Sequence, residues 1–188
     1  WGSKEPCVGN NPLCIAIPRE EGNVVLDMAM SLYSFGKLQV TRLAGEQLPY
    51  PGGYDKDGNV TSDPGALEES GRLFPTGYWK GSGLTIVLDM LAAILSNGNC
   101  TAKIDEIAKG SCGSCSQIFI AINPYMFASK EEVDKILEDT INQIHAASPV
   151  TPGRPARYPG EGTLKTRKEN DELGIPVNEE VWNRVRSL

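Results

Sequence analysis

The stretch Gly77-Tyr78-Trp79-Lys80-Gly81-Ser82-Gly83 stands directly before an apolar run over residues 84–95 and decides the fold prediction. The run predicts a buried helix that ends at Asn97-Gly98-Asn99. At its start, free backbone N–H groups and the positive end of the helix dipole meet the Lys80 ammonium, which suits an anion such as a phosphate. The stretch matches neither G-x-G-x-x-G nor G-x-x-x-x-G-K-[ST], so a turn with a purely structural role is the alternative.

Composition limits the classes of partner. The 188 residues fit one domain or most of one, and a hydrophobic fraction of 40% supports a real core. A net charge of −6 argues against a nucleic-acid partner, because phosphate backbones require a basic face. No uninterrupted apolar run reaches the roughly 18 residues of a membrane span, and no signal peptide is evident. We therefore predict a cytoplasmic protein with no membrane partner.

The five cysteines do not resemble a disulfide framework, since their number is odd, and a reducing compartment fits them. Cys112-Gly-Ser-Cys115 has the C-x-x-C spacing of zinc and redox sites. However, no second such pair exists, and the only histidine, His145, lies far along the chain. We predict no metal site, with metal or redox chemistry at Cys112 and Cys115 as the alternative. Asp55-Lys-Asp57-Gly58-Asn59 lacks the later glycine and glutamate of a calcium loop and is interpreted as a turn.

The order of predicted elements is mixed. A hairpin is expected from strands at 13–17 and 24–26, the second of them buried, followed by a helix over 29–44 and a long irregular segment over 45–77. Beyond the apolar helix, the strongest strand prediction is 117–122, and 149–159 is expected to be extended. Capping residues Ser129 and Asn178 predict helices at 130–147 and 179–186, with another at 163–173. Such a pattern indicates a layered α/β domain.

Several short segments, in order along nearly the whole chain, resemble the malate/L-lactate dehydrogenase family of NAD(P)-dependent reductases. The first is Trp1-Gly2-Ser3-Lys4-Glu5 followed by Gly9-Asn10-Asn11-Pro12-Leu13. Further matches are Asp27-Met28-Ala29-Met30-Ser31, Arg42-Leu43-Ala44-Gly45, Asp57-Gly58-Asn59-Val60-Thr61, residues 77–84, residues 116–122, Pro159-Gly160-Glu161 and Gly174-Ile175-Pro176-Val177. Several motifs in register are far more specific than any one of them.

The resemblance implies the L-sulfolactate dehydrogenase-like fold, a layered α/β/α arrangement with a mixed sheet that is not a Rossmann fold. It also implies a homodimer that passes hydride from NADH, or alternatively NADPH, to a 2-keto acid. Gly77-Tyr78-Trp79-Lys80-Gly81-Ser82-Gly83 is most similar to the branch that reduces 2,3-diketo-L-gulonate to 3-keto-L-gulonate. Malate, lactate, sulfolactate and ureidoglycolate remain as alternative substrates within the family.

By the same resemblance, the cofactor is expected to contact Trp79 and Lys80, together with Gly160, Glu161 and Gly162 in a late Pro-Gly turn. The branch usually has Gly-His-Glu in that turn, whereas this chain has Gly-Glu-Gly. Contacts through backbone atoms survive that change more readily than contacts through the side chain. Without the resemblance, the plain interpretations are a surface lysine and a core tryptophan.

The family's catalytic histidines belong to Ser-His-Gly-x-x-Arg and Asn-x-x-His segments, and neither occurs here. We therefore expect residues 1–188 to be the C-terminal part of a reductase, inactive alone, with no catalytic residue of its own. His145, late in a polar helix, is interpreted as a solvated side chain. Asp27 is interpreted as a cap of the following helix, or as a residue that orients a catalytic group. A non-catalytic binding or dimerisation module is the alternative.

Overall fold

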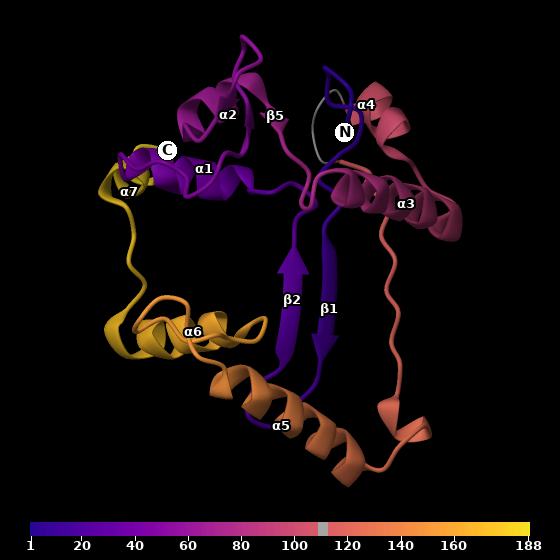
Figure 1. Cartoon of the computed structure of the whole chain (residues 1–188). Coiled ribbons are helices and arrows are strands. Elements are labelled where there is room, and N and C mark those ends of the chain that lie inside the picture. The colour runs from indigo at the N-terminus through magenta and orange to yellow at the C-terminus, as the bar shows by residue number, and fades with distance from the viewer. Residues whose placement is uncertain (109–112) are drawn as a thin grey trace. The chain divides into compact units, whose positions relative to one another are not determined.

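A computed structural model describes residues 1–108 and 113–188. The chain forms two compact units (Figure 1). The first comprises residues 1–13 and 28–121, and the second comprises residues 14–27 and 122–188.

The core of the first unit lies between two short helices. Helix α1, Phe35–Leu43, packs against α2, Pro64–Ser70, and buries Leu38, Leu48 and Leu67 with the half-buried Tyr33 and Leu73 around them. Ser34 begins α1 by accepting a hydrogen bond from the Lys37 N–H. Apolar burial in this cluster is the main stabilising contribution within the unit.

The segment over 45–77, predicted to be irregular, instead holds α2 and a small antiparallel sheet, so that prediction was wrong. The sheet has the order β4–β3–β5, with bounds Val60–Thr61, Gly53–Tyr54 and Arg72–Leu73. Asp63 caps α2, Pro64 fixes its first turn, and Gly71 ends it at φ +66°. The interpretation of Asp55 to Asn59 as a turn is confirmed, since the Asp55 N–H donates to the Asn59 carbonyl.

Helix α1 begins six residues later than predicted from 29–44. Residues before it are held outside a helix by pairing with distant chain, because the Met30 N–H donates to the Asn10 carbonyl and the Leu32 N–H donates to the Phe74 carbonyl. The interpretation of Asp27 as a cap of the following helix is therefore wrong: Ser34 is the cap, and Asn10 receives the N–H groups of Met30 and Ser31. Hydrogen bonds to residues distant in the sequence therefore prevent a helix over residues 29–34, despite the local helix propensity.

Helix α3, Trp79–Ser96, confirms the predicted apolar helix and ends at Asn97 in the left-handed region. Its predicted burial is wrong, because only Gly81 and Thr85 are buried and most apolar side chains face outward. By length and composition alone, its 18 residues would suffice to cross a membrane, which is weak evidence from a single helix. Helix α4, Thr101–Ala108, follows and was not predicted.

Residues 117–122 do not form the predicted strand. The segment carries the outward-facing Phe119 and Ile120, which are 88% and 80% exposed. A continuous apolar run of β-branched and aromatic residues favours extended backbone, but a strand requires a neighbouring chain for its hydrogen bonds. The structure assigns no ladder to this segment.

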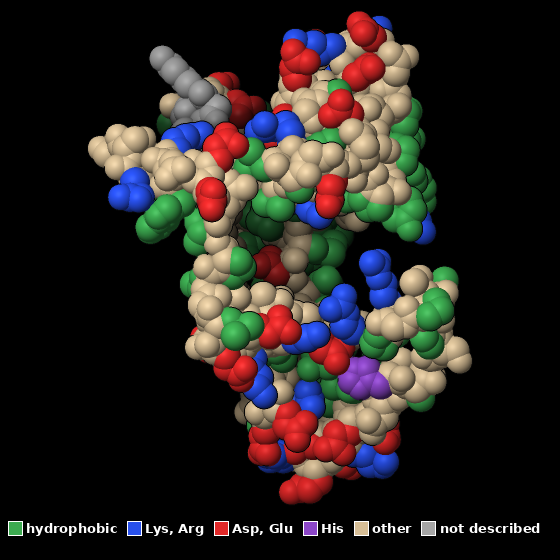
Figure 2. Space-filling view, turned by 90° about the vertical axis from the view of Figure 1, so that its left-hand side faces the viewer, with side chains coloured by type: hydrophobic (Ala, Val, Ile, Leu, Met, Phe, Trp, Pro, Cys, Tyr) green, Lys and Arg blue, Asp and Glu red, His purple; other side chains and the backbone are tan. Residues whose placement is uncertain are grey.

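The second unit contains most of a two-stranded sheet of β1, Leu13–Ile17, and β2, Val24–Met28, which run in opposite directions (Figure 1). The hairpin is confirmed, but β2 is only half buried. Helices α5, Lys130–Ala146, α6, Glu161–Leu173, and α7, Glu179–Arg186, match the predicted helices within two residues, and η1, Pro124–Met126, is a short turn. Carboxylate side chains gather over α5 at the foot of Figure 2.

Candidate functional site

The Trp79–Lys80 turn forms the start of α3. Gly77 and Tyr78 before it have φ +60° and +56°, a conformation that bulky side chains such as tyrosine rarely adopt. Tyr78 precedes the helix without a side-chain cap, and the N–H groups of Trp79 and Gly81 have no acceptor among the described residues. Uncapped N–H groups at a helix start attract an anion.

Trp79 and Lys80 are both on the surface. The indole is 67% exposed, so the interpretation as a core tryptophan does not hold. Lys80 places Nζ 5.9 Å from the centroid of the Trp79 ring and forms no ion pair within the described residues. The pair therefore offers an unpaired positive charge beside a flat aromatic face.

Gly81 lets the start of α3 pass close to the backbone of Thr76, three residues after β5. A Cβ atom at this position would lie 2.0 Å from the backbone carbonyl oxygen of Thr76, a distance that no side chain tolerates. A glycine is thus required to bring the start of α3 against Thr76 and to fix Trp79 and Lys80. Gly83, two residues along, is unconstrained, because a Cβ atom there would have no neighbour within 4 Å.

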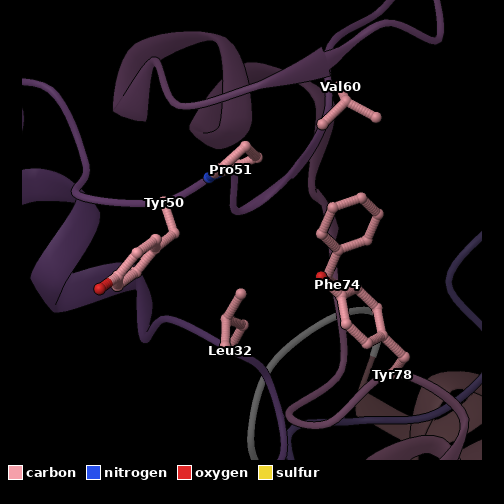
Figure 3. Close-up of a pocket in the computed structure, with 6 residues that line it drawn as sticks. All are labelled: Leu32, Tyr50, Pro51, Val60, Phe74 and Tyr78. Carbon is pink, nitrogen blue, oxygen red and sulfur yellow. The ribbon is translucent and has the colours of Figure 1, made fainter.

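An apolar pocket of about 460 Å³ lies beside this turn (Figure 3). Tyr78 connects the two, since it lines the pocket and directly precedes Trp79. Phe74 packs edge-on against both Tyr78 and Tyr54, with ring centroids 5.7 Å and 5.0 Å apart. The lining, which suits a flat ring or an apolar group, consists of Leu32, Tyr50, Pro51, Val60, Phe74 and Tyr78.

The Pro159–Gly160 bend lies against β2 in the second unit. The Val25 N–H donates a 2.9 Å hydrogen bond to the Pro159 carbonyl. Gly160 has φ +94°, and a Cβ atom there would lie 3.0 Å from the Val25 nitrogen, so only glycine fits without strain. The backbone of the bend is therefore fixed by the hairpin.

The half-buried Glu161 side chain is held by contacts within the protein. Its Oε1 lies 2.9 Å from His145 Nε2, and its Oε2 accepts a hydrogen bond from the Tyr158 N–H at 3.2 Å. The interpretation of His145 as a solvated side chain is confirmed, since the side chain is 40% exposed, although its ring also lies 6.0 Å from that of Tyr158. A cofactor contact through the Glu161 side chain would compete with both interactions.

The first turn of α6 offers donors to an anion. The N–H groups of Gly162 and Thr163 have no acceptor among the described residues, and the helix has no side-chain cap. Arg157 Nη1 lies 3.1 Å from the position that a Cβ atom of Gly162 would occupy, and the described chain gives this guanidinium no carboxylate partner. Sequence reasoning missed Arg157, whose only local signal is its place two residues before Pro159.

The expected cofactor residues fall into two groups. Trp79 and Lys80 belong to the first unit, and Gly160, Glu161 and Gly162 belong to the second. Each group combines free helix-start N–H groups with a cation, which fits the charge and size of a phosphate. Across the described residues, no three metal-ligating side chains cluster, and Cys112 of the C-x-x-C pair lies outside those residues.

Curated relatives align with the whole chain. It is 44% identical over 188 residues to the 2,3-diketo-L-gulonate reductase of Pasteurella multocida and 42% identical to that of Klebsiella pneumoniae. In both cases the match covers 100% of this chain but 56% of the relative, so the chain spans a little over half of their length.

Solved structures agree with that alignment. Sulfolactate dehydrogenase from Methanocaldococcus jannaschii superposes with a TM-score of 0.74 at 28% identity, over 100% of this chain and 54% of that one. Malate dehydrogenase from Entamoeba histolytica, at 24% identity and a TM-score of 0.80 over 94% of this chain and 53% of that one, shares the fold. The expected sulfolactate dehydrogenase-like α/β fold is confirmed. Since residues 1–186 match the family described as malate/L-lactate dehydrogenase, the chain belongs to that family.

Proposed function

We propose that this chain forms the cofactor-holding part of an NAD(P)H-dependent reductase of 2-keto acids. The observation that carries the proposal is the unpaired Lys80 ammonium beside the exposed Trp79 ring, at a helix start whose first N–H groups lack acceptors among the described residues. A dinucleotide presents both partners that these groups require, namely phosphate charge and flat rings. The positive φ of Tyr78 supports the assignment, since strained backbone concentrates at ligand sites.

The second part of the proposed site is the Gly160 bend. Gly162 and Thr163 would donate backbone N–H groups to a cofactor phosphate, with the Arg157 guanidinium beside them. Glu161 would hold the bend in place through His145 rather than contact the cofactor.

When bound, the nicotinamide would supply a hydride to the keto carbon of the substrate. This chain's own residues would bind and orient the dinucleotide, and the Trp79 indole would shield it from water on one side. A proton must also reach the developing alkoxide, and we propose that a histidine outside these 188 residues delivers it. The substrate that we propose first is 2,3-diketo-L-gulonate, on the strength of the 42–44% identical relatives. We also propose that the reductase is a homodimer and that it acts in the cytoplasm.

Titration of the chain with NADH and NADPH, followed by tryptophan fluorescence, tests the cofactor assignment. Saturable quenching that Lys80→Ala weakens is expected. The substrate is tested by recombining the chain with the part of the Pasteurella multocida reductase outside the match, and by screening 2-oxo acids with each cofactor. Cofactor binding that no variant at Lys80 or Arg157 affects would contradict the proposal.

A further inference from the structure

Helix α3 has its polar side inward and its apolar side outward. On the inner side, the Thr85 hydroxyl donates to the Gly9 carbonyl at 3.2 Å, and the Asn11 amide donates to the Thr85 carbonyl at 3.1 Å. Asp89 Oδ1 accepts a 2.7 Å hydrogen bond from the Thr101 hydroxyl and a further bond from the Thr101 N–H. Polar contacts therefore fix the position of α3 within the first unit.

On the outer side, apolar residues follow the spacing of a packing face. Leu84, Val87, Leu91 and Ile94 recur at intervals of three and four residues, so they form one continuous stripe, here called the α3 stripe. Val87 is 50% exposed and Ile94 is 71% exposed. Surface helices of folded proteins bury such a stripe, and a contiguous exposed one marks an interaction surface.

We propose that the α3 stripe is the docking surface for the part of the polypeptide that the diketogulonate reductases carry beyond the matched region. The whole chain matches those relatives, yet nearly half of their length has no counterpart in it. The sulfolactate dehydrogenase structure shows the same relation, since it covers all of this chain with 54% of its own. The inference rests on family membership and does not depend on the proposed reaction.

Residues 117–120 favour a folded segment over a second copy of α3. This part of the first unit exposes Phe119 and Ile120 and has extended backbone without a strand partner among the described residues. A segment that contributes both an apolar layer and a strand would satisfy this backbone and the α3 stripe together. A second α3 helix would supply only the apolar layer.

A lipid bilayer fits α3 less well than a protein partner does. Thr85 and Asp89 on the inner side are bonded to Gly9 and Thr101. A helix that crosses a bilayer would carry the Asp89 charge and these bonded loops into the hydrocarbon, which is costly. Because the α3 stripe lies on one side of the helix only, it suits a protein partner that packs against that side.

The proposal is tested by producing the unmatched part of the Pasteurella multocida reductase as a separate polypeptide and mixing it with this chain. Isothermal titration calorimetry should detect a complex, and hydrogen exchange should show added protection in α3 and 117–122. Val87→Glu would place a charge in the buried interface and should weaken binding at least about tenfold. Val40→Glu, at a comparably exposed valine of α1, should leave the affinity unchanged.

Circular dichroism of both variants checks that the chain still folds, and Val87→Ala provides a second, milder variant whose binding should also weaken. Co-expression with a tag on one partner replaces mixing if the segment is insoluble alone. Failure to co-purify, or equal effects of Val87→Glu and Val40→Glu, would overturn the proposal. A dimer of the chain alone that Val87→Glu dissociates would overturn it in favour of a second copy. Pelleting with phosphatidylcholine vesicles that Val87→Glu abolishes would overturn it in favour of a membrane.

Discussion

Glu161 Oε1 lies 2.9 Å from His145 Nε2, so one carboxylate joins the last turn of α5 to the first turn of α6. The same side chain accepts a hydrogen bond from the Tyr158 N–H through its other oxygen. Both interactions lie next to the bend that we propose as a cofactor contact. The geometry of that bend therefore depends on a side chain that faces the protein.

Glu161→Gln is expected to lower the unfolding free energy of the chain by about 1 kcal/mol, because the partly exposed contact with His145 and the hydrogen bond from the Tyr158 N–H to the carboxylate are both weakened. Urea denaturation followed by circular dichroism measures the change. Glu169→Gln is the matched control, since Glu169 lies on α6 in an exposed pair with Lys165 at 3.7 Å. Equal losses in the two variants would show that the link through His145 carries no stability.

Gly81→Ala should lower the unfolding free energy by about 1–3 kcal/mol, because a Cβ atom 2.0 Å from the Thr76 carbonyl forces the start of α3 to move. Gly83→Ala on the same helix has open space around its Cβ and should stabilise the chain by about 0.4–1 kcal/mol. Urea denaturation of both variants provides the comparison. A neutral Gly81→Ala would mean that Thr76 moves away freely and that the close approach is not required.

Lys80→Ala is expected to raise the dissociation constant for NADH about tenfold, since a charge-assisted contact to phosphate contributes about 1.5 kcal/mol or more. Fluorescence titration at low and high salt measures it, and the difference between the variants should shrink as salt screens the charge. Lys37→Ala, at an exposed lysine of α1, is the control. If Lys37→Ala weakens NADH binding as much as Lys80→Ala does, the effect comes from the net charge of the protein and not from a contact at Lys80.

The capping box of α5 predicts a dependence on pH. Hydrogen bonds from the backbone and the side chain of Ser129 hold the pKa of the Glu132 carboxyl below its ordinary value of 4.5. Because the folded-state pKa is lowered, the stabilising contribution is present above that ordinary value. It is lost as the pH falls through the folded-state pKa.

Helicity of the chain, followed by circular dichroism during acid titration, should therefore fall less steeply in Glu132→Gln than in the unmodified chain over that range. Glu131→Gln removes a neighbouring first-turn carboxylate that is outside the capping box and serves as the control. If both variants titrate like the unmodified chain, the capping box does not contribute to the acid sensitivity.

Local signals in the sequence predicted the helices of the second unit well. Ser129 and Asn178 cap α5 and α7 through their own side chains, and Asn97 ends α3 in the left-handed region, so each boundary depends on neighbouring residues alone. Asp63-Pro64 and Gly71 carried equally local signals for α2, which were missed among the surrounding glycines and prolines.

Properties that depend on distant residues could not be predicted. The non-helical backbone at Met30 and Leu32 depends on hydrogen bonds to Asn10 and Phe74, which are far away in the sequence. The hydropathy of α3 predicted that its apolar side chains are buried. In the structure most of them are exposed, and the polar Thr85 and Asp89 face inward, where they bond to Gly9 and Thr101. At the candidate site, residue spacing alone predicted only the glycine-rich turn that carries Lys80. The family resemblance was needed to predict Gly160, Glu161 and Gly162. The roles of Arg157 and His145 required coordinates.

The hydrogen bond from Val25 to Pro159 has a practical consequence for redesign. Since the hairpin anchors the backbone at Gly160, side chains around the bend other than that of Glu161 can vary while the peptide groups keep their positions. With the bend as the proposed cofactor contact, libraries aimed at switching preference between NADH and NADPH would randomise Arg157 and Thr163 and leave Gly160 and Glu161 unchanged. The positions that tolerate substitution would therefore lie next to the Gly160 bend in the second unit.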